Sequence, residues 1–172
     1  MKKDLHSPLG AIARGLVAGA LGTGAMTLHQ TLVSELRSSR SSDGSSSKSK
    51  QGESWESAPA PAVVAKRILE GVFRRNVPAQ RIGLLTNAMH WAYGTGWGAV
   101  YGLVEGTVRA SPLAAGPLFG GVVWAASYAQ LVPMGLYEPP WTYPVKTLAN
   151  DLGYHVTYGL GVALGYAALD RG

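Results

Sequence analysis

Residues 82–104 read IGLLTNAMHWAYGTGWGAVYGLV, a run of 23 residues without a charged side chain. Crossing the hydrocarbon core of a bilayer takes about 20 residues of α-helix, so this run is long enough to span a membrane. Glycine recurs in it every four residues, at Gly94, Gly98 and Gly102, and again at Gly106 just beyond it. Glycine costs about 1 kcal/mol in a water-exposed helix, whereas membrane helices use small residues where they pack together. The run therefore predicts a membrane helix with a smooth packing ridge.

Three further charge-free runs flank this one, at residues 15–34, 110–137 and 152–169. With the first run they predict four spanning helices, at about 10–33, 84–106, 112–134 and 147–169. Small-residue ridges recur in the other three helices, at Gly15 and Gly19, at Gly116 and Gly120, and at Gly161 and Gly165. These ridges predict packing inside one bundle, with homodimerisation as the alternative use. For the first run a signal peptide is a second interpretation, and burial of all four helices in a soluble protein is another.

The composition favours a membrane protein and narrows its chemistry. Charged residues make up 15% of the chain, against about 25% in soluble domains. The chain has no cysteine, which excludes a disulfide scaffold, a thiolate metal site and a thiol nucleophile. It also lacks a G-x-S-x-G nucleophile elbow and a phosphate-binding glycine loop. We therefore expect no enzyme and no cofactor, with an intramembrane hydrolase using His and Asp side chains as the weaker alternative.

The connection after the first helix has two parts. Residues 1–33 hold the N-terminus and the first helix, and residues 34–61 form a serine-rich stretch that predicts a disordered linker. Residues 62–83 follow, and within them AVVAKRILEGVFRRN (62–76) places apolar side chains at helical spacing beside basic ones. This predicts an amphipathic helix that either lies on anionic lipid or packs on the protein's own loops. No nucleic-acid-binding motif accompanies the basic residues, so we expect no nucleic acid partner.

A repeat relates the second and fourth predicted helices, which belong to the segment 84–172. His90-Trp-Ala-Tyr93-Gly-Thr-Gly96 and His155-Val-Thr-Tyr158-Gly-Leu-Gly161 share the pattern H-x-x-Y-G-x-G at an offset of 65 residues. The pattern predicts two similar hairpins related by a pseudo-twofold axis along the membrane normal. Duplication and convergence within a glycine-rich chain both remain open as explanations.

Polar side chains gather at one depth of the predicted bundle, towards the long connection. They are His29, Asn87, His90, Tyr93, Gln130, Asn150, Asp151, His155 and Tyr158. Three roles compete for this cluster. The first is hydrogen bonding between helices. The second is a proton or solute path, since histidine titrates near neutral pH and ionisable groups in membranes are often functional. The third is a zinc site of His29, His90 and His155 with Asp151 or Glu138.

The distribution of Lys and Arg predicts an orientation. Ten lie on the side of the long connection and five on the side of the termini. The positive-inside rule then places the long connection in the cytoplasm and both termini outside.

Pro133-Met-Gly-Leu-Tyr-Glu-Pro-Pro-Trp141 and Asn150-Asp-Leu-Gly-Tyr-His155 resemble the YagU-like family of small bacterial inner-membrane proteins. The positions that carry the likeness are His90, Pro133, Pro139, Pro140, Trp141, Asp151, Gly153 and His155, within residues 84–169. In this chain the two prolines and the tryptophan are contiguous, and the serine-rich connection has no counterpart in the family. The resemblance implies an inner-membrane location and a link to acid tolerance, without an established substrate or cofactor.

The sequence therefore predicts an all-α integral membrane four-helix bundle with glycine-rich packing and one amphipathic surface helix. We expect an accessory or structural protein of the bacterial inner membrane whose polar cluster holds the helices together. A small oligomeric channel or transporter for protons or a small solute is the alternative, and a membrane-embedded metalloenzyme is the third interpretation. The expected partners are the lipid bilayer, including anionic lipid at residues 62–76, and a second copy of the chain.

Overall fold

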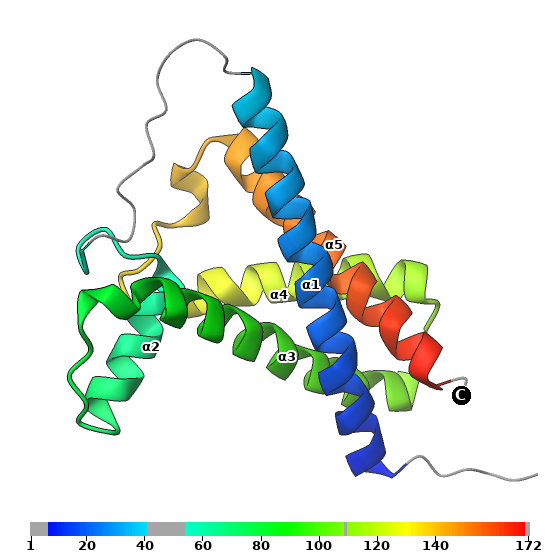
Figure 1. The fold of residues 1–172 in the computed structure, drawn as a ribbon. Helices are drawn as coiled ribbons and strands as arrows, with labels where there is room; N and C mark the ends of the chain where they lie inside the picture. Colours follow the sequence, from blue (N-terminus) through cyan, green and yellow to red (C-terminus); the bar gives the residue numbers. More distant parts are fainter. Residues whose placement is uncertain (1–6, 41–53, 109, 171–172) are drawn as a thin grey trace, which may run out of the picture.

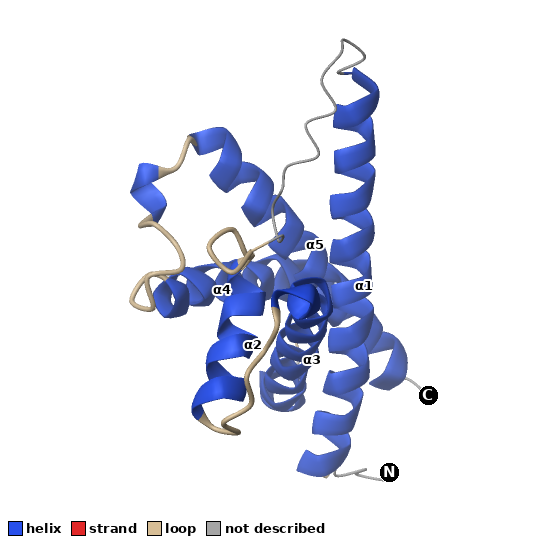
Figure 2. Cartoon of the chain, turned by 60° about the vertical axis from the view of Figure 1, so that its left-hand side comes forward, coloured by secondary structure: helices blue, strands red, loops and turns tan. Residues whose placement is uncertain are grey.

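The computed structural model describes residues 7–40, 54–108 and 110–170, and over these residues the chain is all-helical (Figures 1 and 2). The elements in chain order are α1 (Pro8–Arg40), α2 (Ala60–Gly71), the 3₁₀ turn η1 (Ala79–Arg81), α3 (Ile82–Val108), α4 (Pro112–Leu131), the 3₁₀ turn η2 (Pro140–Thr142) and α5 (Val145–Asp170). The predicted all-α class is confirmed, and a long helix lies in each of the four charge-free runs, although α4 ends at Leu131, before the end of the run 110–137.

Two predicted boundaries are wrong. The linker was expected from residue 34, but α1 continues to Arg40, and residues 41–53 lie outside the described part. The serines of this last turn bond back to carbonyls of the helix, as Ser38 Oγ does to Ser34 O at 3.0 Å, so they accompany the helix instead of ending it. The amphipathic helix was expected to reach residue 76, but α2 ends at Gly71. Arg74 there has a positive φ of 51°, which turns the chain away from the helix axis.

The long helices cross at glycines. α1 packs against both α3 and α5, and α4 packs against α5. At the α1–α3 crossing, a Cβ added to Gly19 would lie 2.8 Å from Gly94 O, and at the α4–α5 crossing a Cβ on Gly116 would lie 2.9 Å from Leu160 Cα. At such separations a side chain cannot fit without moving backbone. The small residues therefore set where these helices meet.

The helices converge at one end and diverge towards the other (Figure 1). The α3–α4 turn lies at the converging end, together with the start of α1 and the end of α5 (Figure 1). There Arg14 Nη2 lies 3.5 Å from Asp170 Oδ1. α2 lies at the diverging end together with the loop between α4 and α5 (Figure 2). Successive long helices thus lead alternately away from and towards the converging end, and α1 crosses α3 steeply in the view of Figure 1.

The described core is apolar, with Thr23 and Ser127 as its polar side chains, but leucine is missing from it. Among the described residues the buried side chains include Ala, Tyr and Thr, such as Ala18, Thr23 and Tyr158, and no leucine. Large apolar side chains face outward instead, with exposed fractions of 53% at Leu21, 72% at Leu118 and 50% at Leu164. These three leucines lie on α1, α4 and α5.

By length and hydropathy, one described helix, α1 over Pro8–Ser39, is apolar enough to cross a membrane. Glycine, tyrosine and tryptophan are abundant in α3 and α4 and lower a mean hydropathy, although membrane helices and membrane interfaces use all three. Leucines and valines of α3 and α4, such as Val104 and Leu118, are nonetheless exposed.

Candidate functional site

The structure divides the predicted polar cluster into three groups at the diverging end of the bundle. The first joins α1 to α5. His29 Nδ1 lies 2.8 Å from Thr157 Oγ1, and Thr157 Oγ1 donates its own hydrogen to Gly153 O at 3.0 Å. The hydroxyl therefore accepts from His29, which fixes the hydrogen on Nδ1 of the ring. The His29 ring also stands edge-on to Tyr154, with 5.0 Å between ring centroids.

This bond predicts a modest stability effect for Thr157→Val, which keeps the side-chain shape and removes the acceptor. We expect the free energy of unfolding to fall by about 1 kcal/mol, because His29 Nδ1–H loses its partner in a half-buried place. Chemical denaturation followed by circular dichroism measures it. Thr31→Val is the matched control, because Thr31 is exposed and its hydroxyl bonds only within α1. An equal loss in both variants would show that the bond to His29 contributes nothing.

The second group is centred on Asp151 at the start of α5. Its Oδ2 accepts from Trp124 Nε1 at 2.9 Å and from the Tyr128 hydroxyl at 3.3 Å, both on α4. His155 Nδ1 lies 3.5 Å from Asp151 Oδ1, but only 2.8 Å from the Asp151 main-chain oxygen, to which it donates. Asp151 and His155 therefore lie close together, as predicted. The shorter bonds of the Asp151 carboxylate, however, join it to Trp124 and Tyr128 of α4.

A recess of about 390 Å³ opens beside this carboxylate. Its lining residues are Arg37, Tyr128, Tyr137, Tyr143, Thr147, Asn150, Asp151 and Tyr154. Burial, and then the nearby Asp151 carboxylate, raises the pKa of the Tyr137 hydroxyl, which therefore stays protonated at neutral pH. The convergence of Tyr137 and Tyr143 on the Asp151 carboxylate was not predicted from the sequence.

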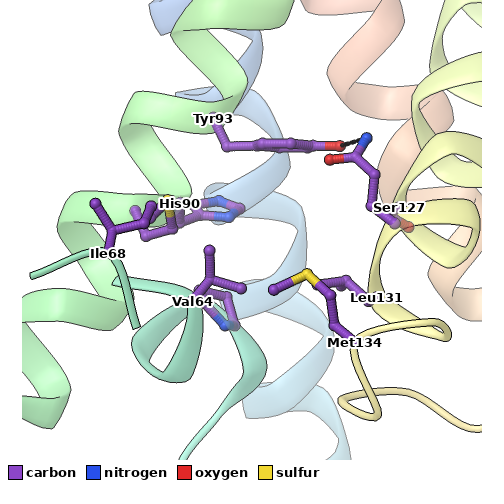
Figure 3. A pocket seen from close by; sticks show the side chains of 10 residues that line it. Val64, Ile68, His90, Tyr93, Ser127, Leu131 and Met134 are labelled. Carbon is purple, nitrogen blue, oxygen red and sulfur yellow. Dashed lines mark hydrogen bonds between the residues drawn. The ribbon is translucent and has the colours of Figure 1, made fainter. Parts of the chain in front are cut away.

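The third group surrounds a cavity of about 290 Å³ between α2, α3 and α4 (Figure 3). Its lining residues are Pro61, Val64, Ile68, Met89, His90, Tyr93, Ser127, Gln130, Leu131 and Met134. Gln130 Nε2 donates to the Tyr93 hydroxyl at 3.1 Å. The Nε2 atom of His90 is buried and has no hydrogen-bond partner. His90, Tyr93 and Gln130 were predicted from the sequence, but Ser127 and the apolar residues that α2 contributes were not.

The two remaining members of the predicted cluster lie apart from these groups. Asn87 is exposed on α3, and its Nδ2 donates to Gly83 O of the same helix at 3.3 Å. Tyr158 is buried in the bundle, where its hydroxyl donates to Gly94 O at 2.6 Å. Tyr166 lies eight residues after Tyr158 on α5. Its hydroxyl likewise donates to a backbone oxygen of α3, Gly102 O, at 3.4 Å.

Five of the six glycines predicted as packing positions on α3 and α5 have described surroundings, and all five lie at contacts between helices. A Cβ on Gly94 would meet Thr23, one on Gly98 would meet Gly15 and Gly19, and one on Gly102 would meet Ala11 and Gly15. On α5, a Cβ on Gly161 would lie 2.9 Å from Gly22 Cα, and one on Gly165 would lie 3.0 Å from Leu21 Cδ1. Only the backbone of Gly106 is described.

The zinc alternative finds no support in this arrangement. In the described part of the chain no three His, Cys, Asp or Glu side chains come close enough together to hold a metal ion. His29 bonds to Thr157 and His90 lines the cavity, so the predicted histidines serve separate groups.

No protein-family model, curated protein or solved structure matches this chain. The resemblance to the YagU-like family therefore stays a hypothesis, and function has to be argued from the molecule itself.

Proposed function

We propose that this chain is an integral membrane protein with four spanning helices, α1, α3, α4 and α5, in the bacterial inner membrane. Its role is that of an accessory or structural component, without catalysis. The observation that carries the proposal is the exposure of large apolar side chains on the long helices. Leu21, Leu118 and Leu164 are half-exposed or more, and large exposed apolar side chains in such number favour contact with lipid or with a partner protein.

The polar contacts support a structural role for the cluster. His29 with Thr157 and Asp151 with Trp124 each bond one long helix to another, and Tyr158 does the same through Gly94 O. At the converging end the helices close on one another through Gly15, Gly98 and Ala11. The predicted cluster thus lies towards the diverging end, and close glycine contacts separate it from Arg14 and Asp170 at the other end, which favours helix association over a path across the membrane.

Cysteine scanning tests the four spans, because the chain has no cysteine of its own. Single variants Gln80→Cys, Ser111→Cys and Thr142→Cys place exposed thiols in three connections. We expect an impermeant maleimide to label Ser111→Cys in intact spheroplasts, and the other two only after lysis. Leu118→Cys, on the outward face of α4, should resist labelling until detergent is added. Labelling of all three loop variants from one side would overturn the four spans and leave α1 as the only anchor.

A flux measurement separates the structural role from conduction. Purified protein is reconstituted in liposomes that hold a pH-sensitive dye, and an acid jump is applied. We expect no proton entry above that of empty liposomes. Entry that is lost in a folded His90→Ala/His155→Ala double variant would replace the structural role with a conducting one.

A further inference from the structure

The four long helices contact one another unequally. α1 and α5 close through Gly22 and Gly161, whereas α3 and α4 hardly meet backbone to backbone. Phe119 of α4 stands between them, with its ring centroid 4.9 Å from that of Tyr101 and 6.2 Å from that of Trp97. This aromatic wedge holds α3 and α4 apart, and the cavity of about 290 Å³ opens in the space between them, with α2 across it.

One wall of the cavity is polar and incompletely bonded. His90 Nε2 is buried without a partner, and leaving a buried polar atom unpaired costs about 1–3 kcal/mol. Beside it, Tyr93 receives a hydrogen bond from Gln130 and keeps its own hydroxyl hydrogen to donate. Figure 3 shows the His90 and Tyr93 side chains reaching into the cavity from α3. The wall therefore offers hydrogen-bonding groups to an oxygen inside the cavity.

The other walls are apolar and include two methionines. Val64 and Ile68 come from α2, Met89 from α3, and Met134 follows α4. Thioether sulfurs make favourable contacts with aromatic rings and adapt to their shape. A volume of about 290 Å³ is at the lower end of ligand sites, about 300–1,000 Å³, so it fits one ring rather than a long chain.

We propose that this cavity binds a small ring molecule that carries a hydroxyl or carbonyl oxygen, of the class of phenols and quinones. The ring lies among Met89, Met134 and Val64, and its oxygen bonds to His90 Nε2 and the Tyr93 hydroxyl. Arg67 holds α2 in place over the cavity, because its Nη1 donates to Met134 O at 2.9 Å. This site goes beyond the structural role proposed above and does not depend on the number of spans.

Two probes of the same shape test the proposal. Duroquinone is a six-membered quinone ring with four methyl groups and two carbonyl oxygens, and durene is a benzene ring with the same four methyl groups and no oxygen. Both are titrated into the full chain in detergent by calorimetry, with empty micelles as the blank. We expect duroquinone to bind at least tenfold more tightly than durene. Equal affinities, or no binding of duroquinone, would overturn the proposal, and equal binding would identify a purely apolar site such as an acyl chain would fill.

Variants locate the binding. His90→Leu should lower the affinity for duroquinone towards that of durene, because only the Tyr93 hydroxyl then bonds the oxygen, and Val64→Trp should abolish binding of both by filling the cavity from α2. Val72→Trp is the matched control, because Val72 is 71% exposed at the end of α2, and its affinity should equal that of the wild type. Unchanged affinity in folded Val64→Trp would place the ligand elsewhere. The probe pair on the wild type decides the question if His90→Leu does not fold.

Discussion

Gly98→Ala should destabilise the protein strongly, while Gly96→Ala, two residues away on the same helix, should not. A Cβ on Gly98 would lie 2.6 Å from Gly19 N and would also clash with Gly15 O, whereas a Cβ on Gly96 would meet nothing within 4 Å. Overpacking costs about 1–3 kcal/mol, and we expect the upper end because backbone atoms cannot swing aside. Gly96→Ala should be neutral, or stabilising by up to about 1 kcal/mol, because alanine is the better helix former.

Thermal unfolding in detergent, followed by circular dichroism, measures the pair. The second crossing provides an independent copy of the test. A Cβ on Gly159 would lie 2.6 Å from Gly120 N, and one on Gly153, earlier in α5, would meet nothing within 4 Å. Similar melting temperatures for Gly98→Ala and Gly96→Ala, or for Gly159→Ala and Gly153→Ala, would show that the crossings are looser than the structure has them.

The sequence predicted which positions pack but not which helices pair. The four-residue spacing of glycines such as Gly94, Gly98 and Gly102 predicts that another helix packs closely against this face. The ridge does not identify its partner, since any other small-residue ridge is equally complementary. That α1 contacts both α3 and α5 therefore depends on the three-dimensional arrangement. The contact of Phe119 with Tyr101 and Trp97 also depends on which helices are neighbours. It was therefore not predicted from the sequence.

Depth along the helices predicted the polar cluster only in part. Position in the sequence fixes the height of a residue in a helix, and His29, His90 and Asp151 do lie towards the diverging end. Height does not fix the direction in which the side chain points round the axis, so Asn87 faces outward. The cavity needed a further element, because Val64 and Ile68 reach it only when α2 docks on α3. Packing on the protein itself was one of the two interpretations of that amphipathic segment.

Two substitutions at one position test the role of Asp151. Asp151→Leu should destabilise the protein by about 3 kcal/mol, whereas Asp151→Asn should cost much less. The carboxylate accepts from Trp124 Nε1 and from the Tyr128 hydroxyl, and hydrogen bonds to charged groups contribute about 1.5–3 kcal/mol each. Leucine has about the same size and leaves both donors unpaired. Asparagine keeps one acceptor oxygen where Oδ2 lies and loses only the charge.

Denaturation of both variants against the wild type gives the two differences in unfolding free energy, and near-ultraviolet circular dichroism reports whether Trp124 keeps a fixed environment. If the two variants are equally destabilised, the charge and not the bonds to α4 is what stabilises this end of the bundle. If neither is destabilised, the contact between α4 and α5 rests on the glycine crossing alone. The expected order, with leucine far worse than asparagine, assigns to Asp151 the bonding of α5 to α4, as His29 and Thr157 bond α1 to α5. Together with the bond from Gln130 of α4 to Tyr93 of α3, the two contacts join the long helices to one another towards the diverging end.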